Sequence, residues 1–124
     1  MSLSRKLLMG MRVGAGLQVL VGVALWMGYW YSLVNVHMLI GVVFVLLLWT
    51  IAGIAISHRQ SVGLAAFAIA WGLLVAGVGM TQQGLLPGDL HWIVRVMHLV
   101  IGLAAMPIAE RLAGSPARSS LQPA

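Results

Sequence analysis

The chain has 124 residues, 61% of them hydrophobic, and it carries only seven basic and two acidic residues. A soluble domain of this size needs more polar surface, so the composition excludes an ordinary soluble protein and indicates a lipid environment. The net charge of +5 does not indicate nucleic-acid binding, because the charges lie at the ends of apolar stretches and form no basic face. The lack of cysteine excludes disulfides, iron–sulfur clusters and thiolate zinc sites.

Four stretches of the chain are apolar enough to cross a bilayer, which takes about 20 residues of helix. They are residues 13–30, 33–56, 62–80 and 91–109. Because the links between them are short, neighbouring helices must run antiparallel. The sequence therefore predicts an all-α membrane protein, an up-down-up-down bundle of four transmembrane helices in one domain over residues 1–112. The remaining residues, 113–124, contain proline and several serines and are expected to form a disordered tail.

The basic residues predict how the chain is oriented in the membrane. If the chain crosses four times, six of them fall on one side: Arg5, Lys6, Arg12, Arg59, Arg111 and Arg118. Loops on the cytoplasmic side carry an excess of lysine and arginine. We therefore expect both termini in the cytoplasm and a location in the bacterial cytoplasmic (inner) membrane.

The two halves of the chain share a short pattern that carries two histidines. Residues 37–41 and 98–102 both read histidine, three apolar residues, glycine. The second and fourth spans run in the same direction, so His37 and His98 should lie at similar depth. In an up-down-up-down bundle these two spans are diagonal partners. The pattern predicts a weak two-fold internal repeat in which two imidazoles face each other across the bundle.

Ionisable side chains within a membrane are costly and usually functional. A zinc site wants three or four protein ligands, and nothing else at this depth supplies them. Haem needs only two axial ligands, because the porphyrin provides four. We therefore expect one haem b per chain, bound by His37 and His98 as metal ligands. Gly41 and Gly102, one turn further in, would leave room for the macrocycle. Interhelical hydrogen bonds, a proton path and a different metal remain alternatives for the histidines, and close helix packing for the glycines.

Arg95 lies inside the fourth span, one turn from His98 and on the same helix face as His91. No acidic residue lies within any span to neutralise it. Haem propionates pointing toward this end would supply the missing negative charge, with Arg95 and His91 close to them. The alternative is that Arg95 extends its guanidinium to the lipid headgroups.

This four-span layout, with His37 and His98 on alternate helices, resembles the small membrane b-type cytochromes. The cytochrome b561 group and each four-helix half of the haem A synthase family are similar in this respect. Haem A synthase halves carry a glutamate and an arginine near the second-helix histidine, where this chain has Asn35 and Met38, so that catalysis is not implied. The b561 group usually holds two haems with four histidines, which this chain cannot place.

The resemblance implies electron transfer more than stand-alone enzymatic catalysis, because two axial histidines close the haem iron to gases. Besides the lipid bilayer, expected partners are a quinol or a larger respiratory or photosynthetic membrane complex. One alternative function is a cofactor-free accessory subunit of such a complex. Another is a small four-helix exporter, although the first span offers only Gln18 where such proteins have an acidic residue.

Overall fold

The structure is a computed structural model that describes the backbone of residues 2–119 and the side chains of residues 2–114. Four long helices follow one another: α1 (Leu3–Trp26), α2 (Val34–Ser57), α3 (Val62–Thr81) and α4 (His91–Ser119). Short 3-10 helices, η1 (Tyr31–Leu33) and η2 (Gln82–Gly84), precede α2 and follow α3. The described residues contain no strand, and all four helices are long and apolar enough to cross a membrane. The expected all-α fold with four membrane-spanning helices is confirmed.

The first and last helices differ in their limits from the predicted spans. The predicted first span began at residue 13, but α1 begins at Leu3, because the Ser2 side chain accepts a hydrogen bond from the Arg5 amide and caps the helix. Helix α1 ends at Trp26, before the predicted limit at residue 30. Shortly after this helix end, Gly28 adopts a left-handed backbone with φ of 86°. At the other end, α4 continues beyond the predicted span end at 109 and the predicted domain limit at 112 to Ser119, and Ala113 is buried in the core. The last part of the predicted tail, residues 120–124, lies outside the described residues.

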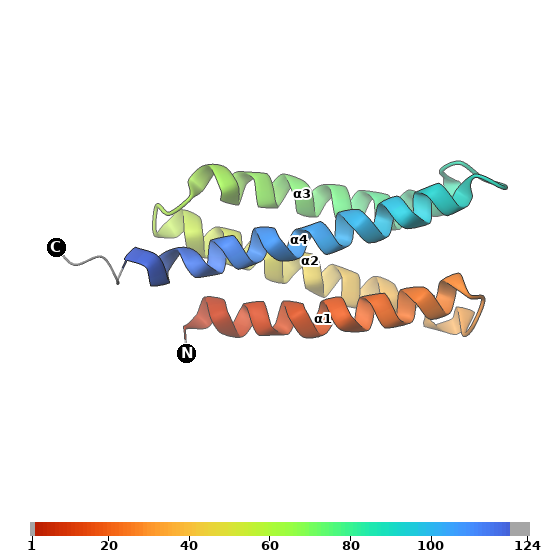
Figure 1. Cartoon of the computed structure of the whole chain (residues 1–124), viewed down its shortest axis with the longest axis horizontal. Coiled ribbons are helices and arrows are strands. Elements are labelled where there is room, and N and C mark those ends of the chain that lie inside the picture. The colour runs from red at the N-terminus through yellow and green to blue at the C-terminus, as the bar shows by residue number, and fades with distance from the viewer. Residues whose placement is uncertain (1, 120–124) are drawn as a thin grey trace.

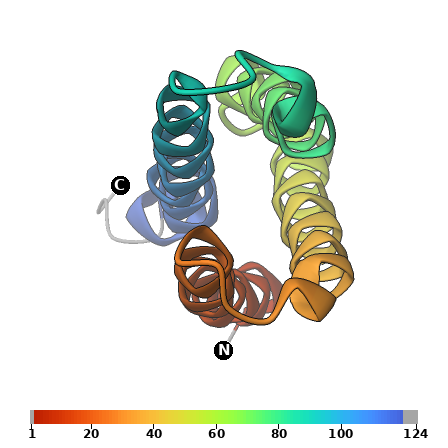
Figure 2. The same ribbon diagram turned by 90° about the vertical axis from the view of Figure 1, so that its right-hand side faces the viewer.

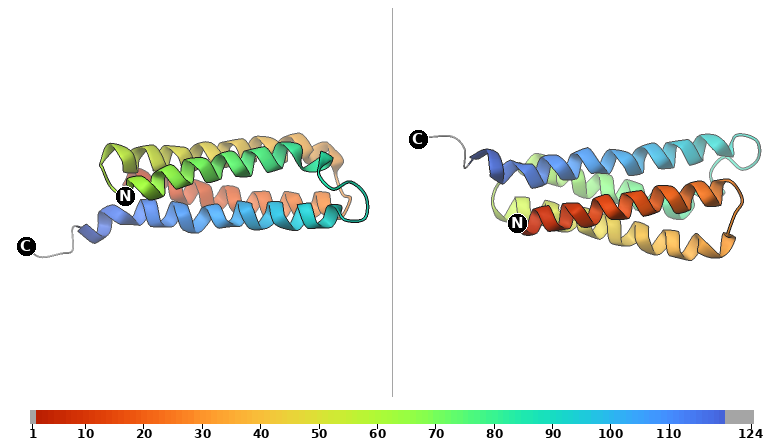
Figure 3. Two further views of the ribbon diagram at one scale, coloured as in Figure 1. Left: turned by 90° about the horizontal axis from the view of Figure 1, so that it is seen from above. Right: turned by 60° about the horizontal axis from the view of Figure 1, so that its bottom comes forward.

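The helices run up, down, up and down. The start of α1 and the end of α4 therefore lie at the same end of the bundle (Figures 1 and 3). We call this the basic end, formed by residues 2–12, 57–62 and 110–114. The other end, formed by residues 26–34 and 81–91, is called the loop end. Viewed along the bundle, the helices follow the order α1, α2, α3, α4 around a closed ring (Figure 2). Helices α2 and α4 approach each other across one diagonal, whereas α1 and α3 do not meet across the other.

The hydrophobic core lies mainly in the half of the bundle nearest the basic end. Its buried residues there are Leu8, Met11, Phe44, Val45, Leu48, Ile51, Ala52, Ala55, Ala65, Ala68, Ala105, Ala109, Leu112 and Ala113. The alanines let the helices pack closely, as is common between membrane helices. Nearer the loop end, the buried hydrophobic side chains are Val75 and Val94. The tightly packed core therefore ends before the level of the histidines.

Polar contacts join neighbouring helices. The Trp49 indole of α2 donates a hydrogen bond to the Ile69 carbonyl of α3 at 3.2 Å, and the Trp71 indole of α3 donates to the Ile101 carbonyl of α4 at 3.0 Å. Arg12 of α1 pairs with Glu110 of α4 at 3.1 Å. The sequence placed Arg12 among the basic residues of this end but did not reveal its partner. Each of these contacts joins two helices that are adjacent around the ring.

The contact between Trp49 and α3 depends on Gly72. A Cβ at this position would overlap the Trp49 indole nitrogen. Gly72→Ala should therefore displace the indole from the Ile69 carbonyl and lower the free energy of unfolding by about 1–3 kcal/mol, the usual cost of overpacking. Thermal unfolding in detergent, followed by circular dichroism, measures this. Gly77→Ala on the same helix is the matched control, because a Cβ there meets no atom within 4 Å. Equal melting temperatures for the two variants would contradict the assignment.

Candidate histidine site

The structure brings His37 of α2 and His98 of α4 together across the bundle diagonal, near the loop end. Their ring centroids are 6.3 Å apart and their planes are inclined by 64°. Both residues are partly buried. Helices α2 and α4 contact each other across the bundle, and each histidine lies within the first two turns of a helix that begins at the loop end, so the two rings lie at similar depth.

Each histidine ring lies against a glycine of the preceding helix. A Cβ at Gly22 of α1 would lie 3.2 Å from Cε1 of His37, and a Cβ at Gly79 of α3 would lie 3.2 Å from Cε1 of His98. Both distances are shorter than ordinary van der Waals contact. The two hairpins, α1–α2 and α3–α4, therefore position their histidines in the same way. This correspondence extends the two-fold repeat beyond the histidine and glycine pattern in the sequence.

The histidine rings have no hydrogen-bond partner among the described residues. In both rings Nδ1 is buried and unpaired, and Oε1 of Gln18 on α1 is also buried and unpaired. Buried polar atoms are normally paired, and an unpaired one costs about 1–3 kcal/mol. No interhelical hydrogen bond of these two histidine rings is found among the described residues.

The separation of the ring centroids is one that two ligands of a single metal atom can have. An imidazole nitrogen binds a first-row transition metal at about 2.0–2.1 Å, so two imidazoles whose nitrogens both point at one metal would have ring centres roughly 6 Å apart. Edge-to-face aromatic pairs without a metal cover the same range, about 4.5–7 Å. The observed distance is 6.3 Å. Within the described chain, no group of three or more histidine, cysteine, aspartate or glutamate side chains is placed to hold a metal ion. The donor set therefore suits a metal that needs two protein ligands, as haem iron does.

The two glycines of the sequence repeat have different surroundings. A Cβ at Gly41 would lie 2.8 Å from Nε2 of Gln18, so close packing against α1 accounts for this glycine. A Cβ at Gly102 would meet no atom within 4 Å, although the residue is partly buried. No contact within the described residues accounts for Gly102.

The polar residues of the loop end are separated by the structure. Nδ1 of His91 donates a hydrogen bond to the Leu85 carbonyl at 3.1 Å, which ties the start of α4 to the preceding loop. Arg95 is exposed, and no ion pair or hydrogen bond to it is found in the described part of the chain. Its exposure is compatible with either a propionate or a lipid headgroup as the partner.

Sequence reasoning did not assign Gly22 and Gly79 to the histidines, although the structure places them against the two rings. The sequence shows them in stripes of small residues along the first and third spans, which equally indicate helix packing. The order of glycine and histidine along each helical hairpin could have indicated these contacts. Because the loop-end glycine of one helix precedes the loop-end histidine of the next, an antiparallel pair must bring the two to similar depth.

Fold and site together define a multi-pass membrane protein with a pair of imidazoles across the diagonal of a four-helix bundle. Comparisons with models of protein families, with curated proteins and with solved structures give no match. Any assignment of function therefore rests on the residues and their geometry.

The contacts between glycines and histidines predict changes in the NMR resonances of the histidine rings, and these changes do not depend on a cofactor. In Gly22→Ala the His37 ring must move by a few tenths of an ångström, so its Cε1–Hε1 resonance should shift more than that of His98. Gly79→Ala should give the opposite pattern. Carbon–proton NMR spectra of the protein in detergent micelles measure both resonances. Gly16→Ala is the control, since a Cβ there meets nothing within 4 Å. If the histidine resonances shift as much in Gly16→Ala as in Gly22→Ala and Gly79→Ala, the ring contacts are not specific.

Proposed function

We propose that this protein is a membrane b-type cytochrome that holds one haem b between His37 and His98 and transfers electrons. The observation that carries the proposal is the histidine pair, separated by 6.3 Å across the diagonal and lacking any other partner. Haem held by His37 and His98 would supply one-electron transfer, and with both histidines bound its iron would have no open position for a gas ligand. The same pair suits a cofactor whose porphyrin provides the remaining four ligands.

The chain's own residues would fix the geometry of such a site. Gly22 and Gly79 restrict the orientation of the two rings, and because they lie on separate hairpins each ring is held independently. The space beside Gly102 is free of protein atoms within 4 Å of a would-be Cβ. The packed core on the basic side would limit how deep a planar cofactor could lie in the bundle.

The membrane setting suggests where electrons would come from. The four helices are exposed to the bilayer over much of their length, so a quinol is one donor within reach. A larger respiratory or photosynthetic complex is another, with this chain as one subunit.

Visible spectroscopy of the purified protein tests the proposal. The wild type should show a low-spin b-type spectrum and about one haem per chain by haemochrome assay. His37→Ala and His98→Ala should each lose haem or keep only a high-spin remnant. His58→Ala is the matched control, because His58 ends α2 at the opposite end of the bundle and is exposed. A wild type expressed with sufficient haem that binds none would favour a cofactor-free accessory subunit, and a full low-spin spectrum in His37→Ala would refute the pairing.

Arg95 extends the proposal to the propionates. If they point toward the loop end, the exposed guanidinium of Arg95 would lie one turn from His98 and provide their counter-charge. A positive charge near the iron disfavours the more positive oxidised state and so raises the midpoint potential. Solvent and headgroups would screen part of this effect.

Removing that charge should lower the midpoint potential. Arg95→Leu should lower it more than Arg95→Lys, which keeps the charge but loses the bidentate geometry. Redox titrations of the wild type and both variants in one detergent give the comparison, with Arg5→Leu at the basic end as the control. An unchanged potential in Arg95→Leu with haem still bound would place Arg95 at the lipid headgroups.

We further propose that the basic end faces the cytoplasm of a bacterial cell, with the protein in the cytoplasmic membrane. Arg5, Lys6, Arg12, Arg59 and Arg111 all lie at this end. An excess of basic residues is typical of cytoplasmic segments. The histidine pair would then lie near the outer face.

A reporter fused after Ala124 tests the orientation. Green fluorescent protein, which fluoresces when it folds in the cytoplasm, should be bright at this position, and alkaline phosphatase, which is active in the periplasm, should be inactive. Fusions in the 84–90 loop should give the reverse. Alkaline phosphatase activity after Ala124 would overturn the orientation.

A further inference from the structure

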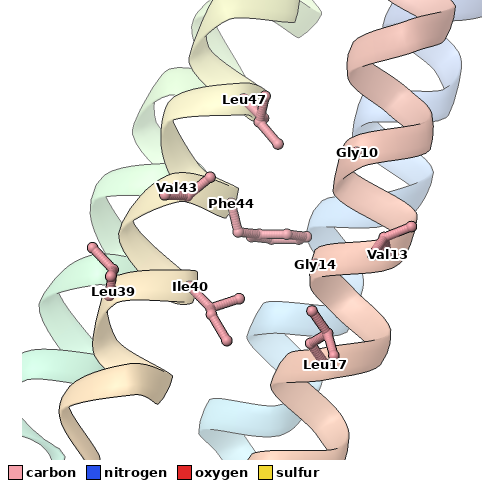
Figure 4. A pocket seen from close by; sticks show the side chains of 9 residues that line it. All are labelled: Gly10, Val13, Gly14, Leu17, Leu39, Ile40, Val43, Phe44 and Leu47. Carbon is pink, nitrogen blue, oxygen red and sulfur yellow. The ribbon is translucent and has the colours of Figure 1, made fainter.

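Helices α1 and α2 enclose an apolar groove on the outside of the bundle. Its walls and floor are formed by Gly10, Val13, Gly14, Leu17, Leu39, Ile40, Val43, Phe44 and Leu47, and its volume is about 300 Å³. Figure 4 shows Phe44 and Leu47 of α2 extending toward Gly14 and Gly10 of α1. A Cβ at either glycine would meet those side chains only at 3.8 and 3.5 Å. The glycines therefore make the groove deeper than helix packing alone requires.

A basic residue continues the groove at its end. Helical periodicity puts Lys6 on the same face of α1 as Gly10, Val13 and Leu17, one turn toward the basic end. Lys6 is exposed. On α2 the same face ends at His58, four residues beyond Ile54. Arg5 and Arg12 lie on the other side of α1, where Arg12 pairs with Glu110 of α4. Among the basic residues of α1, Lys6 is therefore the one that continues the helix face on which Gly10, Val13 and Leu17 line the groove.

The length of α1 from Lys6 to the far end of the groove matches the hydrocarbon thickness of one bilayer leaflet. Lys6 and Leu17 are separated by about 16 Å along α1, at a rise of about 1.5 Å per residue. The hydrocarbon core of a bilayer is about 30 Å thick, so one leaflet contributes about 15 Å. A chain that starts at Lys6 and follows the groove would therefore end near the bilayer midplane, where the groove also ends.

We propose that the α1–α2 groove binds one anionic phospholipid, with an acyl chain along Gly10 and Gly14 and its phosphate at Lys6. An apolar groove with a cation at only one end is complementary to an amphiphile with a negative head. Basic residues near a membrane surface attract anionic lipid headgroups, and basic pockets between membrane helices bind them. The amino end of α1 adds positive partial charge on the same side. This proposal does not depend on haem binding.

Native mass spectrometry of the delipidated full chain in detergent tests this. The two probes are dioleoyl phosphatidylglycerol, which is anionic, and dioleoyl phosphatidylcholine, which is zwitterionic. The wild type should bind one phosphatidylglycerol at least about fivefold more tightly than phosphatidylcholine, the effect expected of one basic residue near an anionic headgroup. Lys6→Gln should lower phosphatidylglycerol affinity to that of phosphatidylcholine. Val43→Trp, which fills the groove from a partly exposed wall, should weaken both.

Two matched controls distinguish a site from general lipid contact. Arg5→Gln removes a neighbouring cation from a different face of α1, and Val100→Trp adds the same bulk to an exposed position of α4. Both should bind as the wild type does. Equal binding of the two lipids by the wild type, or equal losses in Arg5→Gln and Lys6→Gln, would mean annular lipid only. A dimer of the chain that Val43→Trp dissociates would make a second copy the occupant and overturn the proposal.

Discussion

The close approach of α2 and α4 across the bundle diagonal is the contact on which the candidate site depends. A four-helix ring has two diagonals, and in this protein only one is short. Its two helices carry His37 and His98, so the short diagonal brings the two rings to 6.3 Å. Small residues on α4, such as Ala105 and Ala109, permit the approach because they are fully buried at the centre.

The two ends of the bundle differ in packing and in polarity. At the basic end, aliphatic side chains fill the interior and Arg12 pairs with Glu110. Toward the loop end the interior contains imidazole rings and the Gln18 amide, with buried atoms that lack partners. In lipid such atoms have no water to compensate them. The tightly packed core therefore lies toward the basic end, and the unpaired polar atoms found among the described residues lie toward the loop end.

Glycine has three different roles in this chain. Gly72 admits an indole that reaches the carbonyl of Ile69, and Gly22 and Gly79 admit the imidazole rings. Gly10 and Gly14 leave a groove on the lipid side. In the sequence all of these belong to similar stripes of small residues. The difference between them is decided by the side chain that the neighbouring helix presents at the same depth.

The sequence by itself determined the fold class, because a chain in lipid must satisfy its backbone hydrogen bonds within each apolar segment, and four such segments of sufficient length form four helices. Antiparallel order followed from the short links, and equal depth of His37 and His98 followed from their positions on parallel spans. The sequence did not determine where α1 begins, since Ser2 caps a helix that continues through charged residues. It also did not determine which diagonal is short, that Gly41 packs on Gln18 while Gly102 does not pack at all, or that Arg12 meets Glu110. These depend on the rotation of each helix about its axis and its distance from its neighbours, which are set by the joint packing of side chains from four helices and not by the pattern along any one of them.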